Sequence, residues 1–423
     1  MGSNLRLECV GCGALYAPHR LHCDQCDGLL QSLYHSTAFK PTDRSTLFAF
    51  TDWLPSSSSS DLRIGARVYQ SDKLAQRLGL ANLAIAFSGY APEIEAYNPT
   101  GSFKDFEATP TMLYYREHGI DSLILASAGN TARAFAYAAV QLDFSVIIVI
   151  PERALERLWI PCEPTDAIRL VVLEGCDDYA VAIRTASLIG QTLGITNEGG
   201  ARNVARRDGM STAILEYAKQ QNRLPAHYFQ AIGSGTGAIA TWEAAQRLIV
   251  AGVDARLPKL HLSQNAPFTP IHEAWTHNKP IAPDADVEDQ LRRIDQIDAL
   301  VLANRTPPYA IAGGVRDALI STTGITYAIP NEDARAAAAL FEQTEGLAIG
   351  PAASVATASL VQAIDSGNIN TEDAIMLHIT GNNAALLQKD VTLHKIDPVW
   401  AVRPDEVSEK SVREASSRIL RSR

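Results

Sequence analysis

The fold class can be inferred from residues 123–150, which read LILASAGNTARAFAYAAVQLDFSVIIVI. Two short apolar runs, at 123–126 and 145–150, are typical of buried β-strands. The longer run at 131–141 has a helical pattern, and the polar loop SAGN precedes it. Because a strand, a helix and a second strand follow one another, this stretch predicts a parallel sheet covered by helices.

The same alternation extends over most of the chain. It predicts further strands at 83–87, 169–173, 227–232 and 259–263, and further helices at 102–117, 179–193, 210–221, 239–251 and 332–343. So many units require at least two sheets, and 423 residues are enough for two or three domains. We expect an N-terminal segment at 1–35, a large domain built from 36–105 and 204–423, and a smaller mobile domain at 106–203. The five serines at 56–60 predict a mobile surface loop.

Composition and charge narrow the classes of function. The chain is 46% hydrophobic and 20% charged, as in ordinary globular proteins. Its net charge of −10 argues against a partner such as nucleic acid or an anionic membrane surface. The longest apolar run, at 144–150, is far shorter than the roughly 20 residues of a membrane span, and the first residues lack the apolar region of a signal peptide. We therefore expect a cytoplasmic protein that acts on small molecules.

Four of the six cysteines are clustered near the N-terminus, in the pattern C-x2-C, ten residues, C-x2-C. They are Cys9, Cys12, Cys23 and Cys26. Two such pairs supply four thiolates for a tetrahedral zinc ion, so residues 1–35 predict a zinc ribbon. Four sulfur ligands close the coordination shell, and the zinc would then be structural. The alternative is that these are redox or vestigial thiols that bind no metal.

Polar loops follow two of the predicted strands. After 123–126, Ser127, Asn130 and Thr131 offer hydroxyl, amide and backbone N–H groups at the start of a helix. Such a loop suits a carboxylate or phosphate, although it is also a good helix cap. After 227–232 comes a glycine loop that suits a phosphate, made of Gly233, Ser234, Gly235, Thr236 and Gly237. A dinucleotide site would need an acid after the next strand, which ends in Gln264 and Asn265 instead.

A lysine stands in a position that requires an explanation. Residues 97–106 read YNPTGSFKDF, in which a Pro-Gly turn and a capping Ser102 precede Lys104 on the first helical turn. The positive end of a helix disfavours an ammonium group. Lys104 is therefore either a solvated surface charge or an amine whose pKa is lowered for a purpose.

The stretch 197–209 is basic within an acidic protein. Arg202 and Arg206 would share a helix face at i, i+4, and Arg207 follows. These side chains are either a solvated basic face or an anion site. Near the end of the chain, Thr380 follows an apolar run at 374–377 and precedes a glycine. A lysine amine and a phosphate loop, without the acid of a dinucleotide site, suggest pyridoxal phosphate held as a Schiff base.

The motifs NPTGSFKD, SAGNT, GSGTG, TEGLAIGPAAS and ITGN resemble those of fold-type II pyridoxal-phosphate enzymes, the tryptophan-synthase-β-like group, and most of all its threonine synthase branch. Three further blocks, CVGCGALY…HCDQCDGLL, EGGARNVARRDGMST and LPAHYFQAIGSGTG, resemble the cysteate synthases of that branch. The resemblance covers nearly the whole chain. It implies a two-domain α/β fold with parallel or mixed sheets, and a homodimer.

The resemblance also implies roles for single residues. Lys104 is similar to the Schiff-base lysine, Asn130 to the partner of the cofactor's phenolate oxygen, and Thr380 to the partner of its pyridine nitrogen. Ser127 and Thr131 would hold the substrate carboxylate, and residues 233–237 the cofactor phosphate. Our own candidates for the substrate phosphate or the incoming sulfite are Arg202, Arg206 and Arg207.

The implied reaction is a β-replacement that converts O-phospho-L-serine and sulfite to L-cysteate and phosphate through an aminoacrylate, as in coenzyme M biosynthesis. Two enzymatic alternatives are threonine synthase, which acts on O-phosphohomoserine, and a related β-replacing enzyme of a specialised pathway. One methylene in a pocket is worth only about 1–3 kcal/mol, so the sequence leaves the first alternative open. The non-enzymatic alternative is a zinc-ribbon binding protein built on an inactive pyridoxal-phosphate fold.

Overall fold

A six-stranded sheet forms the centre of the larger part of the computed structural model, which describes residues 5–127, 129–282, 284–382 and 384–420. Its strand order is β15 (Ile325–Ile329), β14 (Lys259–Asn265), β13 (His227–Ala231), β16 (Ala374–Ile379), β5 (Asn82–Phe87) and β4 (Arg67–Gln70). All neighbours are parallel except β4, which pairs antiparallel with β5 at the edge. A mixed sheet with one antiparallel edge strand agrees with the predicted fold class.

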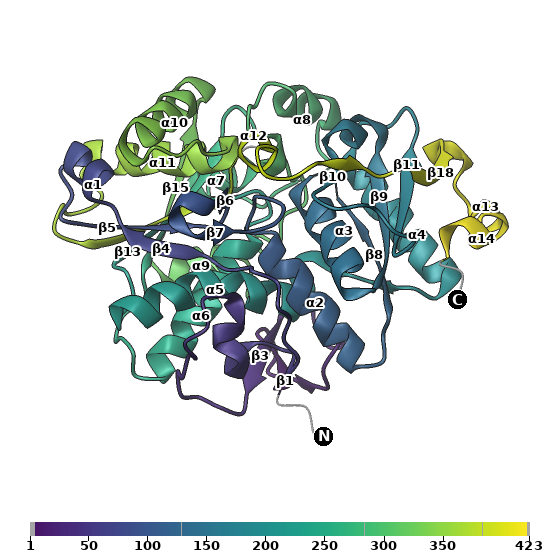
Figure 1. Ribbon diagram of the computed structural model, residues 1–423, viewed down its shortest axis with the longest axis horizontal. Helices are drawn as coiled ribbons and strands as arrows, with labels where there is room; N and C mark the ends of the chain where they lie inside the picture. The colour runs from purple at the N-terminus through teal and green to yellow at the C-terminus, as the bar shows by residue number, and fades with distance from the viewer. Residues whose placement is uncertain (1–4, 128, 283, 383, 421–423) are drawn as a thin grey trace.

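A five-stranded parallel sheet forms the second part. Its order is β12 (Thr196–Asn197), β8 (Ser122–Ala126), β9 (Ser145–Pro151), β11 (Ile168–Leu173) and β18 (Pro398–Val402). The last strand comes from the C-terminal part of the chain, which crosses back over the molecule to reach this sheet (Figure 1). Strand β18 lies in the segment expected within the large domain, yet it pairs with β11 of the smaller sheet.

Helices cover both faces of the sheets. They are α1 (Asp72–Leu78), α2 (Asp105–Glu117), α3 (Asn130–Leu142), α4 (Tyr179–Leu193), α5 (Val204–Gln221), α6 (Thr236–Val250), α7 (Pro270–Thr276), α8 (Val287–Ile294), α9 (Val315–Ser321), α10 (Asn331–Glu345), α11 (Pro351–Asp365), α12 (Ala384–Leu387), α13 (Glu409–Glu414) and α14 (Ser416–Ile419). Helices α10 and α11 lie on one face of the six-stranded sheet, and α5 and α6 on the other (Figure 1). The strands of the sheet are buried on both faces, which explains their nearly continuous apolar runs.

The predicted elements are confirmed with small shifts of their ends. Strand β9 matches the apolar run at 145–150, and α4 matches its predicted bounds. Helix α5 begins at Val204, six residues before the predicted start, because the side chain of Asn203 accepts a hydrogen bond from the backbone N–H of Ala205. Among the described residues, no helix combines the length and the apolar character needed to cross a membrane.

The serine run at 56–60 lies largely on the surface, as its composition predicts, and its first three hydroxyl groups are hydrogen-bonded. The hydroxyl groups of Ser56, Ser57 and Ser58 all donate to the same oxygen of Glu117 at the end of α2, at 2.7–2.9 Å. Partial burial raises the pKa of Glu117, but these hydrogen bonds outweigh it and lower the pKa overall. Glu117 can bind all three hydroxyl groups because one carboxylate can accept several donors.

The N-terminal segment folds into a small antiparallel sheet of β1 (Leu5–Cys9), β2 (Leu15–Tyr16) and β3 (Leu30–Tyr34). The hydroxyl groups of Ser32 and Tyr34 donate to the carboxylate of Asp208 on α5. Apolar side chains of β1 also join the core of the small sheet. The segment is thus packed against the body of the protein.

The remaining short strands are β6 (Tyr90–Ala91) with β7 (Ala96–Tyr97), and β10 (Trp159–Ile160) with β17 (His394–Lys395).

Candidate functional site

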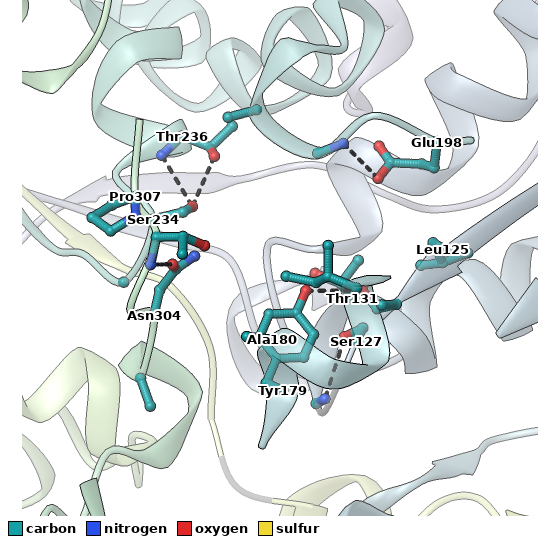
Figure 2. Close-up of a pocket in the computed structure, with 18 of the residues that line it drawn as sticks. Leu125, Ser127, Thr131, Tyr179, Ala180, Glu198, Ser234, Thr236, Asn304 and Pro307 are labelled. Carbon is teal, nitrogen blue, oxygen red and sulfur yellow. Dashed lines mark hydrogen bonds between the residues drawn. The ribbon is translucent and has the colours of Figure 1, made fainter. Parts of the chain in front are cut away.

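A cavity of about 1050 Å³ opens where loops of the two sheets face each other. The loops that follow β8, β9, β13 and β16 line it, as expected for the carboxyl ends of parallel strands. The predicted residues that meet there are Lys104, Ser127, Asn130, Thr131, Arg202, Arg206, Gly233, Ser234, Gly235, Thr236, Gly237 and Thr380. Figure 2 shows Ser127 and Thr131 on one side of the pocket, with Ser234 and Thr236 on the other.

The loop before α2 holds Lys104 against the end of β16. Gly101 has a φ of 69°, a conformation that favours glycine, and the backbone N–H of Phe103 donates to the carbonyl of Thr380 at 3.0 Å. The carboxylate of Asp105 accepts from the backbone and the hydroxyl of Thr100 at 2.9 and 2.8 Å. These contacts fix the backbone of Lys104 beside Thr380.

Lys104 itself is the N-cap residue of α2. The sequence predicted Ser102 as the cap, but its hydroxyl only accepts from the backbone N–H of Lys104 at 3.4 Å. The predicted helix start at 102 is wrong because residues 102–104 still form the turn that precedes the helix. The position of Lys104 at the positive helix end is confirmed.

A buried carboxylate contacts the lysine amine. Nζ of Lys104 lies 3.3 Å from Oε2 of Glu107, one helical turn away. Burial lowers the pKa of Lys104, and the charge of Glu107 opposes this only in part. The lowered pKa expected for Lys104 is thus supported by its surroundings, since desolvation is the larger effect.

Glu107 also joins two other residues of the cavity. Its Oε1 accepts from the hydroxyl of Thr131 at 2.8 Å and lies 3.2 Å from a guanidinium nitrogen of Arg206. Glu198 forms a second ion pair with Arg206 at 2.9 Å. Burial raises the pKa of Glu198, and Arg206 opposes the shift. We call Lys104, Glu107, Glu198 and Arg206 the buried charge network, which joins two basic and two acidic side chains.

Neither carboxylate of this network was predicted from the sequence. Glu107 could have been found from its i, i+3 spacing to Lys104, which places the two side chains on one helix face. Glu198 lies eight residues before Arg206 and outside the helix, so no spacing rule identifies it.

The three candidate arginines occupy three different environments. Arg206 lies in the cavity within the charge network, and Arg202 lines the cavity but pairs with Asp27 of the ribbon. Arg207 is fully buried and pairs with Glu243 at 3.0 Å on α6. Arg207 is not among the described residues that line the cavity, so the structure does not support it as an anion ligand.

The predicted helix face shared by Arg202 and Arg206 is also wrong. Arg202 ends a short 3-10 turn, η4 (Gly200–Arg202), and α5 begins only after Asn203. The backbone of Asn203 is extended because this residue caps the following helix. The two arginines reach the cavity from different elements.

The glycine loop after β13 has the shape of an anion cradle. Gly235 has a φ of 78°, and a Cβ on Gly237 would lie 2.5 Å from Nε2 of Gln230. The loop leads into the N-terminus of α6, and the hydroxyl groups of Ser234 and Thr236 lie 2.8 Å apart (Figure 2). A phosphate fits such a loop, because backbone N–H groups and the helix end supply positive charge. With Lys104 in the same cavity, the residues fit pyridoxal phosphate.

The loop after β8 makes hydrogen bonds at the start of α3 and also lines the cavity. The hydroxyl of Ser127 accepts from the backbone N–H groups of Gly129 and Ala132 at 3.3 and 3.1 Å, so it caps the start of α3. The amide oxygen of Asn130 accepts from the guanidinium of Arg133. Both residues line the cavity, and their roles toward a cofactor or substrate stay predictions.

The four clustered cysteines can hold one metal ion. The sulfur atoms of Cys9, Cys12, Cys23 and Cys26 all lie within 4.8 Å of one another. Cys9 and Cys26 approach to 3.4 Å, and Cys12 and Cys23 to 3.5 Å. Four sulfurs at such spacing fit tetrahedral zinc with no open position.

The ribbon also forms part of the cavity wall. Leu21 and His22, between the two cysteine pairs, line the cavity. Gly199 packs so closely on Leu21 that a Cβ on the glycine would lie 2.5 Å from Cδ2 of the leucine. Together with the ion pair between Asp27 and Arg202, these contacts link the cysteine-bearing segment to the wall of the cavity.

Loss of the metal is therefore expected to weaken substrate binding. The Cys12→Ser variant should lose zinc and raise KM for the amino-acid substrate about tenfold, or about 1.4 kcal/mol, with a smaller change in kcat. The measurement is zinc content alongside steady-state kinetics. Cys162→Ser, outside the cluster, is the matched control. A zinc-free Cys12→Ser protein with an unchanged KM would contradict this prediction.

Comparison with known proteins places these features in a family. A family model described as pyridoxal-phosphate dependent enzyme matches residues 93–381. The chain is 43% identical to a cysteate synthase of Methanosarcina barkeri, over 96% of this chain and 98% of the relative. It is 44% identical to the cysteate synthase of Methanosarcina acetivorans (95% and 97% covered) and 43% to that of Methanocella paludicola (97% and 96%).

Solved structures share the fold at low sequence identity. A diaminopropionate ammonia lyase of Escherichia coli superposes with a TM-score of 0.58 at 12% identity, covering 83% of this chain and 93% of that chain. Threonine deaminase isoform 2 of Solanum lycopersicum gives a TM-score of 0.56 at 17% identity, with 77% and 86% covered. These likenesses support the fold-type II architecture.

Proposed function

Because the chain belongs to the cysteate synthase family of pyridoxal-phosphate-dependent enzymes, we propose that it converts O-phospho-L-serine and sulfite to L-cysteate and phosphate. In this exchange the bond between Cβ and the phosphate oxygen breaks, and a bond between Cβ and sulfur forms. The proton that leaves Cα is returned to it, so the reaction needs no oxidant or reductant. The observation that carries the proposal is the partly buried amine of Lys104, in one cavity with the glycine loop.

We propose tasks for predicted cofactor-binding residues of the cavity. The bound cofactor supplies an electron sink that makes the proton on Cα acidic. Lys104 holds the cofactor and, once its amine is free, accepts that proton at Nζ and later returns it. Burial favours the neutral amine, which is the form that a base requires. The glycine loop would hold the cofactor phosphate, and the hydroxyl of Thr380 would bind the ring nitrogen.

The substrate is held from the opposite side of the cavity. We propose that Ser127, Thr131 and the N-terminus of α3 bind its carboxylate. Arg206 orients the phosphate, since two carboxylates fix its guanidinium. Arg202 contributes from the rim beside the ribbon. The homodimer and the cytoplasmic location expected from the sequence stay predictions.

The direct test supplies the purified holoenzyme with its substrates. O-Phosphoserine with sulfite should yield equal amounts of cysteate and phosphate, measured by mass spectrometry and a phosphate assay. O-Phosphohomoserine without sulfite is the comparison, because threonine synthase would convert it to threonine. Faster release of threonine than of cysteate would overturn the proposal.

A further inference from the structure

We propose that Arg157 forms an additional oxyanion-binding site in the cavity, which receives the phosphate group of the amino-acid substrate, the sulfite, or both in turn. Arg157 is the last residue of η3 (Glu152–Arg157), the 3-10 turn that follows β9. The inference rests on the proposed function for the identity of these ligands. It extends that function to a residue outside the basic stretch at 197–209.

The other cations of the cavity are already neutralised. Each has a carboxylate partner: Lys104 with Glu107, Arg206 with Glu107 and Glu198, Arg202 with Asp27, Arg153 with Asp295, and Arg305 with Asp178. Phosphate esters and sulfite carry up to two negative charges. The buried charge network has no excess positive charge to offset them, so a further cation is needed to stabilise the bound oxyanion.

Arg157 has no carboxylate partner among the described residues. Among the residues that the structure describes, it forms no ion pair and no hydrogen bond through its side chain, although it lines the cavity. Its surroundings are cationic: burial, and then the charge of Arg153, lower the pKa of Arg157. The charge of Arg157 in turn adds to the burial that lowers the pKa of Arg133 to about 10. An anion would relieve this repulsion.

The position of Arg157 suits a ligand held at the substrate loop. Strand β9 lies next to β8 in the sheet, so the turn after β9 lies beside the loop that carries Ser127. Arg157 shares a small recess with Ser127, Gly129 and Ala132. It therefore approaches the cavity from the small sheet, whereas Arg206 approaches from α5. The guanidinium of Arg157 can match two oxygens of a bound oxyanion in a planar fork.

Arg157→Gln tests the site by two independent readouts. The first is binding of inorganic sulfate to the holoenzyme by calorimetry, which needs no turnover. It should weaken at least tenfold. The second is KM, measured separately for O-phosphoserine and for sulfite, and at least one should rise tenfold. Which KM rises identifies the oxyanion that uses the site.

The controls separate binding from folding. Arg157→Lys should recover part of the sulfate affinity because it keeps the charge, and it serves as the test if the glutamine variant fails to fold. Arg335→Gln removes an exposed arginine that is paired with Asp298, and should leave all constants unchanged. Sulfate affinity and both KM values within twofold of wild type would overturn the proposal. A wild-type enzyme that binds sulfate but forms no cysteate would refute the proposed function alone.

Discussion

Replacing Lys104 by alanine is expected to lower turnover by about 10²- to 10⁴-fold, the range that a general base contributes. The variant loses the amine that holds the cofactor and the group that accepts the proton from Cα. Its visible absorbance should therefore change together with its rate. Both quantities can be measured on the same sample, after loading with pyridoxal phosphate.

A matched control and a rescue experiment sharpen this test. Lys219→Ala removes a lysine of α5 that pairs with Glu216 outside the cavity, and should keep normal turnover. A small amine such as methylamine should restore part of the activity of Lys104→Ala, since a soluble base can enter a cavity of this size. Wild-type absorbance and full turnover in Lys104→Ala would exclude the lysine from both roles.

Much of the fold could be predicted because local patterns agree with the tertiary structure. The strand at 145–150 and the helix at 179–193 are long enough, and apolar enough, to be read from periodicity alone. The pairing of β18 with the five-stranded sheet could not be predicted, for a physical reason. A five-residue strand that pairs with β11, far back in the chain, carries no local mark of its partner.

The parts of the candidate site that could be predicted lie in loops with recognisable motifs. The ion pairs that Glu107 and Glu198 form with the basic residues could not be predicted. The glycine loop and Thr380 come together because β13 and β16 are parallel neighbours that end at the same edge. Lys104 joins them through the backbone hydrogen bond between Phe103 and Thr380. Arg207 looked the same as Arg206 in sequence, yet it points to Glu243, since adjacent helical residues face different directions. The contact of Ser56, Ser57 and Ser58 with Glu117 could not be predicted, because the partner lies about 60 residues away in the sequence.

Replacing Glu107 by glutamine is expected to lower kcat by about 10²-fold, although Glu107 lies outside the chemical step. The carboxylate contacts Lys104, Thr131 and Arg206 at once, and it is fully buried. A glutamine amide presents an NH₂ group to one of two cations that need an acceptor. Arg206 then keeps only Glu198 as a charged partner. Lys104 and Arg206 both lose the contact that fixes their position.

The pH dependence distinguishes this electrostatic effect from a simple loss of structure. In the wild-type protein, burial lowers the pKa of Lys104 and Glu107 opposes that shift. Without the charge of Glu107, the pKa of Lys104 falls further, so its amine stays neutral down to a lower pH. The acid limb of the kcat profile should therefore move to lower pH in Glu107→Gln, even as the maximum rate falls.

Glu243→Gln is the matched control for Glu107→Gln. It removes a buried carboxylate from an ion pair with Arg207, outside the cavity. We expect it to lower the free energy of unfolding by about 3 kcal/mol, because it leaves a buried arginine without its charged partner, while the kcat profile keeps its shape. If both variants lost stability equally and neither shifted the acid limb, Glu107 would be a structural residue. A shift confined to Glu107→Gln would show that the charge network sets the proton affinity of the lysine.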